Sequence, residues 1–216
     1  MNTFTEENYL KTIYHCALDA GSASTNQIAA ATNTRAASVT DMLKKLAEKK
    51  LINYTKYQGV TLSEEGEKIA LGIIRKHRLW EYFLVEKLNF KWDEVHEMAE
   101  EMEHISSNEL IDRLDKFMGY PKSDPHGDPI PDCNGNFKAH DLKPVSTVDI
   151  HTGGVISGVR DHSAAFLQYL DKQGLTIGKK ITVTDTVEFD RSMVLQLGDK
   201  TIQISREVAN NLLITL

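Results

Sequence analysis

The chain has 216 residues with 26% charged and 41% apolar side chains, enough for one large domain or two to three small ones, and no apolar run approaches the roughly 18 residues of a membrane helix. Its two cysteines, Cys16 and Cys133, lie far apart and outside any CxxC motif, which argues against a disulfide framework or a thiolate zinc site. The net charge of -6 comes from the part after residue 75, since residues 1–75 carry nine Lys/Arg and eight Asp/Glu, so charge neither supports nor excludes DNA binding by the N-terminal part.

Residues 1–75 have the pattern of a winged helix. Apolar side chains at spacings of three and four predict an amphipathic helix over residues 6–20. Two more helical stretches, separated by a polar turn at residues 32–34, predict a helix-turn-helix. Residues 51–57 are rich in β-branched and aromatic side chains, and residues 60–62 can pair with them across a Gln-Gly turn, so we expect a hairpin that forms the wing.

The helix-turn-helix makes DNA the favoured ligand of this part of the chain, although such helix pairs also occur in small bundles that bind nothing. The second helix is expected to enter the major groove, and the wing to approach the DNA backbone or the minor groove. On the second helix the candidates for base contacts are Arg35, Ala37, Ser38 and Asp41, with Thr40 and Lys44 at phosphates, and on the wing the candidates are Tyr54, Lys56, Tyr57 and Gln58.

The rest of the chain predicts a helical part, a proline-rich segment and a small β module. Ser63, followed by acidic residues, is a typical helix N-cap, and this helix is expected to continue to about Leu88. All five prolines lie within residues 119–144, which predicts a tether or an ordered loop between domains. Further helices are expected over residues 93–104, 107–117 and 163–172, and the strands of a β-barrel-like module over residues 155–156, 180–184, 194–197 and 201–205.

The run HEMAEEMEH from His96 to His104 indicates a metal site. On a helix its two imidazoles share one arc with the carboxylates of Glu100 and Glu103, opposite an apolar side, although charged helix faces are often merely solvated. Glu100, Glu103 and His104 form one potential ligand set. His77 and Glu81, four residues apart on another helix, form a second set that His96 can complete. Such hard ligands without thiolate favour Mn(II) or Fe(II), although Zn(II) can displace either by affinity.

Two other interpretations compete with a metal-sensing regulator. Glu101 and His104 form a Glu-x-x-His motif, as in carboxylate-ligated metalloenzymes, but ferritin-like centres need two such motifs and the chain has one. The alternative within DNA-binding proteins is a metal-indifferent winged-helix regulator whose acidic helix is only a dimer surface.

The order of these parts resembles the diphtheria-toxin-repressor family over essentially the whole chain. The resemblance depends on RKHRLWEYFL around His77 and Glu81, on the E-x-x-E-H that ends at His104, and on PHGDPIP at residues 125–131. A glutamate at position 100, where the iron-responsive branch has a cysteine, makes the chain similar to the manganese-responsive branch. The implied fold is mainly α with a small β part: a winged helix-turn-helix (1–75), a helical metal-binding and dimerisation domain (76–118), a Pro-rich tether (119–144) and an SH3-like (FeoA-like) β-barrel (145–216).

The family resemblance implies a protein that is not an enzyme but a homodimeric repressor of metal-uptake genes. It would be activated by Mn(II), with Fe(II) as the alternative and Zn(II) as a possible ligand in vitro. Its partner would be palindromic double-stranded operator DNA, and it would bind neither a membrane nor a small organic substrate. We expect it in the cytoplasm, because the polar and acidic start of the chain does not resemble a secretory signal. Metal would tie the first helix to the dimerisation helix, and so hold two recognition helices about 34 Å apart.

The ligands implied by the resemblance fall into two sites. Asn8 stands where relatives have an aspartate or a methionine, and its neutral amide attracts a cation less than a carboxylate does. Lys11 stands where some manganese regulators have a glutamate, which argues against a closely spaced pair of ions. The alternative to metal binding is packing within a loop for His126 and helix capping for Asp161. The regulatory site would comprise Asn8, Glu100, Glu103 and His104, and the ancillary site His77, Glu81 and His96 or, as in some manganese-responsive relatives, also Asp124, His126 and Asp161.

Overall fold

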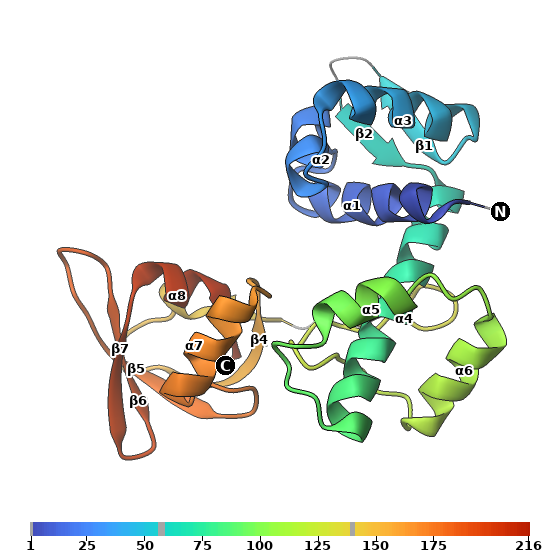
Figure 1. The fold of residues 1–216 in the computed structure, drawn as a ribbon. Coiled ribbons are helices and arrows are strands. Elements are labelled where there is room, and N and C mark those ends of the chain that lie inside the picture. The colour runs from blue at the N-terminus through green and yellow to red at the C-terminus, as the bar shows by residue number, and fades with distance from the viewer. Residues whose placement is uncertain (1, 56–58, 139–140) are drawn as a thin grey trace. The chain divides into compact units, whose positions relative to one another are not determined.

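The computed structural model describes residues 2–55, 59–138 and 141–216 (Figure 1). The chain divides into two compact units. Tyr57, predicted to contact DNA, lies outside the described residues, as do Lys56 and Gln58. None of the helices in the described ranges is long and apolar enough to cross a membrane. The first unit contains Met1–His77, Glu103–Asn108 and Pro131–Asn136, and the second contains Arg78–Met102, Glu109–Ile130 and Phe137–Leu216.

The first unit contains the predicted helix-turn-helix and its wing. The hairpin pairs Ile52 with Leu62 in antiparallel register. The first helix starts two residues before its predicted start, because the Thr3 hydroxyl accepts from the Glu6 backbone N–H at 3.3 Å and the Glu6 carboxylate accepts from the Thr3 N–H at 2.8 Å. Leu10, Leu43 and other apolar side chains of these elements form one buried core. The elements are α1 (Phe4–Ala20), α2 (Thr25–Ala31), α3 (Ala36–Glu48), β1 (Ile52–Thr55) and β2 (Gly59–Leu62).

One long helix, α4 (Glu64–Leu88), supplies residues to both units. Ser63 caps its first turn as predicted, with its hydroxyl oxygen 3.1 Å from the backbone nitrogen of Gly66. The helix also ends at the predicted residue. Glu81 is therefore fixed on a continuous helix that begins directly after the wing.

The next helix is shorter than predicted. We expected residues 93–104 to be helical, but α5 spans only His96–Met102. At its start, the Lys91 N–H donates to the Glu94 carboxylate and the Glu94 N–H to the Lys91 carbonyl, both at 3.0 Å, which closes a turn instead of a helix. Glu103 and His104 lie in a turn after the helix, so the predicted arc of four ligands on one helix is wrong. The following helix, α6 (Asn108–Phe117), agrees with its prediction to within one residue.

The segment rich in proline is ordered over the residues that matter for the site. Its backbone folds back on itself, with the Asp124 N–H 3.0 Å from the Asp128 carbonyl and the Ile130 N–H 2.9 Å from the Lys122 carbonyl. Asp124 and His126 are buried within it. Of the two predictions for this segment, an ordered loop is the one that fits residues 119–138.

The C-terminal part of the second unit is a six-stranded antiparallel sheet with the strand order β3-β8-β4-β5-β6-β7. The four predicted strands and the predicted helix are present, and Leu167 of that helix packs in the same core as Ile156 and Leu195 of the sheet. The sequence analysis missed a last helix and two strands, one of which, β8, lies between β3 and β4. The elements are β3 (Lys143–Pro144), a 3-10 turn (Val145–Thr147), β4 (Gly153–Val159), α7 (Ala164–Gln173), β5 (Lys180–Thr186), β6 (Met193–Leu197), β7 (Lys200–Ile204), α8 (Arg206–Asn211) and β8 (Leu212–Thr215).

Candidate metal centre

Three buried side chains of the second unit form the strongest candidate site, which we call the Glu81 cluster: Glu81, Asp124 and His126. Glu81 comes from α4, and the other two come from the ordered loop. One potential ligand atom from each lies within 4.8 Å of those of the other two. A hard divalent cation lies about 2.0–2.6 Å from each of its ligand atoms, so two ligand atoms of one cation can be separated by up to twice that distance. The cluster therefore has the size of a cation site.

The hydrogen bonds of His126 leave one ring nitrogen for a ligand. Its Nε2 lies 2.8 Å from the backbone carbonyl of Trp92, which only accepts, so Nε2 carries the proton. Its Nδ1 is buried, has no hydrogen-bond partner within the described part of the chain, and lies 3.5 Å from Glu81 Oε2. A backbone carbonyl on the far nitrogen is the usual way in which proteins orient a metal-binding imidazole.

The electrostatics of the cluster favour a bound cation. Burial raises the pKa of Asp124 to about 7, and the neighbouring carboxylates of Asp128 and Glu81 act in the same direction. Burial lowers the pKa of His126, but the carboxylates of Glu81 and Asp124 outweigh this effect and raise it to about 9. The neighbouring carboxylates thus contribute to both shifts, and a divalent cation bound among them would offset their negative charge.

Other predicted ligands lie at the edge of the cluster or have another role. His96 is half exposed, and its Nδ1 lies 3.4 Å from Glu81 Oε1. Asp161 accepts a 2.8 Å hydrogen bond from the backbone N–H of Ser163, the N-cap residue of α7, and so closes a turn before the helix instead of capping it. Arg78, which was not predicted, lies 3.7 Å from Asp124 and 3.2 Å from Asp128, and so fixes the loop from the side of α4.

The predicted regulatory ligands are divided between the two units. Asn8, Glu103 and His104 belong to the first unit, where Glu103 is fully buried and Asn8 Oδ1 is buried without a hydrogen-bond partner among the described residues. His77, predicted for the ancillary site, also belongs to the first unit, and its Nδ1 lies 2.7 Å from Glu103 Oε2. Glu100 belongs to the second unit, with a carboxylate oxygen 3.8 Å from His96 Nε2.

The residues of the second helix that were predicted to contact DNA lie on α3 or directly before it, and Tyr54 of the wing lies on β1. Arg35 is the N-cap residue of α3, and Ala37, Ser38, Asp41 and Lys44 are exposed. Asp41 and Lys44 form an ion pair of 3.2 Å with each other, and the Thr40 hydroxyl donates to the Ala36 carbonyl at 2.9 Å. The side chains at positions 37 and 38 are short and exposed, which is compatible with a helix that enters the major groove.

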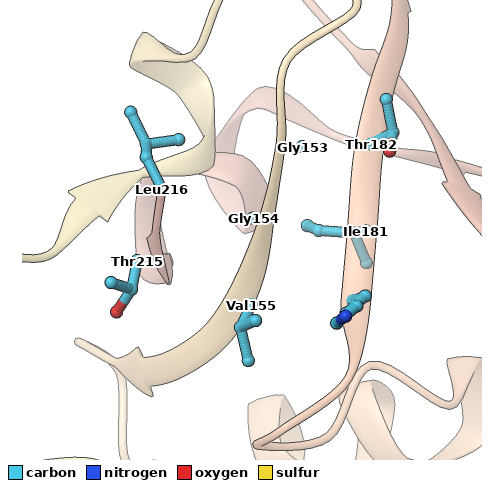
Figure 2. A pocket seen from close by; sticks show the side chains of 8 residues that line it. Gly153, Gly154, Val155, Ile181, Thr182, Thr215 and Leu216 are labelled. Atoms are coloured by element: carbon cyan, nitrogen blue, oxygen red, sulfur yellow. The ribbon is translucent and has the colours of Figure 1, made fainter.

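A groove of about 340 Å³ on the sheet is a separate surface feature. Figure 2 shows Gly153, Gly154 and Val155 of β4 between Thr215 of β8 on one side and Ile181 and Thr182 of β5 on the other. Its eight lining residues include no carboxylate side chain, imidazole or thiol, so it does not offer the ligands of a metal or the groups of a hydrolytic site.

Three family profiles match the chain. Residues 1–60 match "Iron dependent repressor, N-terminal DNA binding domain", residues 63–132 match "Iron dependent repressor, metal binding and dimerisation domain", and residues 143–216 match "FeoA domain". Together they cover the helix-turn-helix, the Glu81 cluster and the sheet.

Similar proteins are metal-dependent regulators. A manganese-dependent transcriptional repressor in complex with manganese has a TM-score of 0.89 and 29% identity, with 97% of this chain and 98% of that chain covered. The manganese regulator SloR has a TM-score of 0.78 and 32% identity, with 97% of each chain covered. The iron-dependent repressor IdeR of Mycobacterium tuberculosis is 32% identical over 127 residues, which are 59% of this chain and 55% of the relative, so the match spans about half of that relative.

Proposed function

Because the chain belongs to the iron-dependent repressor family of metal-dependent, DNA-binding transcriptional regulators, which includes the diphtheria toxin repressor, we propose that it represses metal-uptake genes when Mn(II) is bound. The family consists of regulators and not of enzymes, so the metalloenzyme interpretation has no support. The observation that carries the proposal is the orientation of His126, whose Nδ1 lies 3.5 Å from Glu81 Oε2 in a buried cluster with two carboxylates.

The choice of Mn(II) rests on the ligand atoms together with the similar solved structures. Two carboxylates and one imidazole are hard to intermediate donors, which suit Mn(II) and Fe(II) better than Cu(I) or a structural zinc ion. Neither cysteine belongs to the Glu81 cluster, since Cys16 lies on α1 and Cys133 is exposed. Similar solved proteins include a repressor in complex with manganese and the manganese regulator SloR, which supports Mn(II) over Fe(II).

A metal ion bound at the Glu81 cluster would make part of the second unit more ordered. Glu81 is fixed on α4, whereas Asp124 and His126 belong to a loop held mostly by backbone hydrogen bonds and Arg78. A cation shared by all three would hold the loop on the helix, and α4 is continuous with the segment that follows the wing. Regulation of this kind requires only that the cation binds the ordered state more tightly, typically by 1–3 kcal/mol.

The proposed active form is a homodimer on palindromic DNA. α6 buries Ile111 and Leu114 but exposes Leu110 and Phe117, which are seven residues apart and therefore share a face. Lys87, at the end of α4, lies 5.8 Å from the centre of the Phe117 ring, so the end of α4 adjoins this face. An exposed apolar face on a helix of a dimerisation domain is a suitable surface for a second copy.

The experiment is a mobility-shift titration of the full chain with DNA duplexes selected in vitro in the presence of Mn(II). Mn(II), Fe(II) and Zn(II) are compared with a chelator control. We expect Mn(II) to raise DNA affinity at least tenfold, and Glu81→Gln to remove this increase. Glu86→Gln, an exposed glutamate on the same helix, is the matched control and should retain it. Equal DNA affinity with metal and with chelator would instead identify a metal-indifferent regulator.

A further inference from the structure

Glu103 of the first unit already has close hydrogen-bond partners on both of its carboxylate oxygens. Lys11 Nζ, on α1, donates to both of its carboxylate oxygens, at 2.7 and 2.8 Å. His77 Nδ1 lies 2.7 Å from Oε2. The Glu103 side chain is fully buried and that of Lys11 is 14% exposed, so water screens this ion pair little.

Within the first unit, further charged groups lie near Glu103 or interact with it. His104 Nδ1 lies 2.8 Å from a carboxylate oxygen of Glu7, and its Nε2 lies 3.8 Å from Glu103 Oε1. Lys76 is a second lysine whose charge interacts with both glutamates. We call Glu7, Lys11, His77, Glu103 and His104 the Glu103 cluster. Its two carboxylates thus interact with the charges of two lysines, Lys11 and Lys76. In the Glu81 cluster, Arg78 lies 3.7 Å from Asp124.

An ammonium group and a divalent cation compete for Glu103 in this geometry. A divalent cation would lie about 2.0–2.6 Å from a carboxylate oxygen, and both oxygens of Glu103 are within 2.8 Å of Lys11 Nζ. The two cations would be close neighbours in a buried environment, where like charges repel strongly. For a metal to bind, Lys11 would have to leave its carboxylate and become solvated.

We infer that Lys11 is a built-in cation that closes the Glu103 cluster to metal, so that each subunit takes a single regulatory divalent ion, at the Glu81 cluster. The inference rests on the proposed function for the identity of that ion. Lys11 then performs in this chain the task that a metal at Glu103 would perform: it links α1 of the DNA-binding part to the turn after α5. This link does not depend on metal, so metal control passes to the Glu81 cluster alone.

The test counts bound Mn(II) in variants of this chain. The free ion is measured by its electron paramagnetic resonance signal and subtracted from the total. The wild type should bind one ion per subunit and Glu81→Gln none. Lys11→Met should bind two, and Lys11→Met combined with Glu81→Gln should bind one. The second ion would have Glu103, His104 and the unpartnered Asn8 Oδ1 as donors. Lys68→Met, an exposed lysine of the same unit, is the control and should bind one ion.

Glu103→Gln provides an independent measurement if Lys11→Met does not fold, because it should leave the count of the otherwise wild-type chain at one ion. A wild-type count of two that falls to one in Glu103→Gln would overturn the inference, as would a double variant that binds no ion. A wild type that binds no Mn(II), beside a double variant that binds one, would contradict the proposed function and still support the role of Lys11.

Discussion

The imidazole rings of His126 and His162 are stacked, with centroids 4.7 Å apart and planes inclined by 20°. The Trp92 ring is also stacked on His126, with centroids 6.0 Å apart and planes inclined by 18°. The rings thus come from the ordered loop, from the residue before the N-cap of α7, and from the turn before α5. The orientation of the candidate ligand is therefore set by aromatic contacts as well as by its hydrogen bond to the Trp92 carbonyl.

We expect His162 to position His126 through this stack. His162→Phe keeps an aromatic ring and should leave the Mn(II) affinity of the Glu81 cluster within about threefold of wild type, whereas His162→Ala should weaken it about tenfold, in the range typical of residues that orient a metal ligand. Isothermal titration calorimetry with Mn(II) measures both. Equal weakening by the two substitutions would mean that the His162 ring nitrogens, and not its stacking, are needed.

Gly127 allows the ordered loop to pack against β4. It has φ of +92°, and a Cβ atom built on it would lie 2.1 Å from the carbonyl oxygen of Ser157. Gly127→Ala should displace the loop between Asp124 and His126 and weaken Mn(II) binding at least tenfold. The control is Gly119→Ala, which has φ of +79° but open space around the Cβ position, and so bears the backbone strain without the collision. Similar binding by both variants would show that the loop tolerates the displacement.

Glu6 should make the first unit sensitive to acid. Burial raises the pKa of Glu6, but hydrogen bonds from Lys49, the Thr3 backbone and Lys45 outweigh it and lower the pKa to about 2 from 4.5. Because the folded-state pKa is depressed, the stabilisation is complete above pH 4.5 and is lost as the pH falls towards 2.

Glu6→Gln should therefore destabilise the first unit by about 1–3 kcal/mol at pH 7, and the difference from wild type should disappear near pH 2. Native-state hydrogen exchange of the core amides of Leu10 and Leu43 reports on this unit alone. Glu48→Gln, an exposed glutamate on α3, should show no such change with pH. A difference that persists at low pH would rule out an electrostatic origin.

Those parts of the fold that local signals determine could be predicted from the sequence. The cap at Ser63 predicted the start of α4, because capping acts over a few residues, and the helix ends at the expected Leu88. β8 was missed because Leu212–Thr215 is a short apolar run whose strand pairing with β4 joins residues more than 50 positions apart. The end of α5 also depends on a distant partner, since Glu103 turns inward to Lys11.

The candidate site was predictable in its residue types but not in its grouping. Glu81 was identified from its spacing to His77, and Asp124 and His126 from the family resemblance. The sequence contains no local signal for His162, because its contact with His126 arises only when the sheet and the loop come together. Lys11 was recognised as a departure from relatives, but its bond to Glu103 depends on the tertiary fold.

The exposed face of α6 should be needed for assembly. Leu110 is 42% and Phe117 68% exposed although both are large and apolar, and burying such side chains against a second copy typically contributes about 1.5–3 kcal/mol each. Phe117→Asp should therefore weaken dimerisation at least tenfold, and with it the cooperative binding of a palindromic duplex. Sedimentation equilibrium measures the first effect and a mobility shift the second.

The matched control is Phe189→Asp in the second unit. The Phe189 side chain is 98% exposed between β5 and β6, so this substitution should not affect assembly. A Phe117→Asp protein that sediments as the wild-type dimer would place the subunit interface elsewhere.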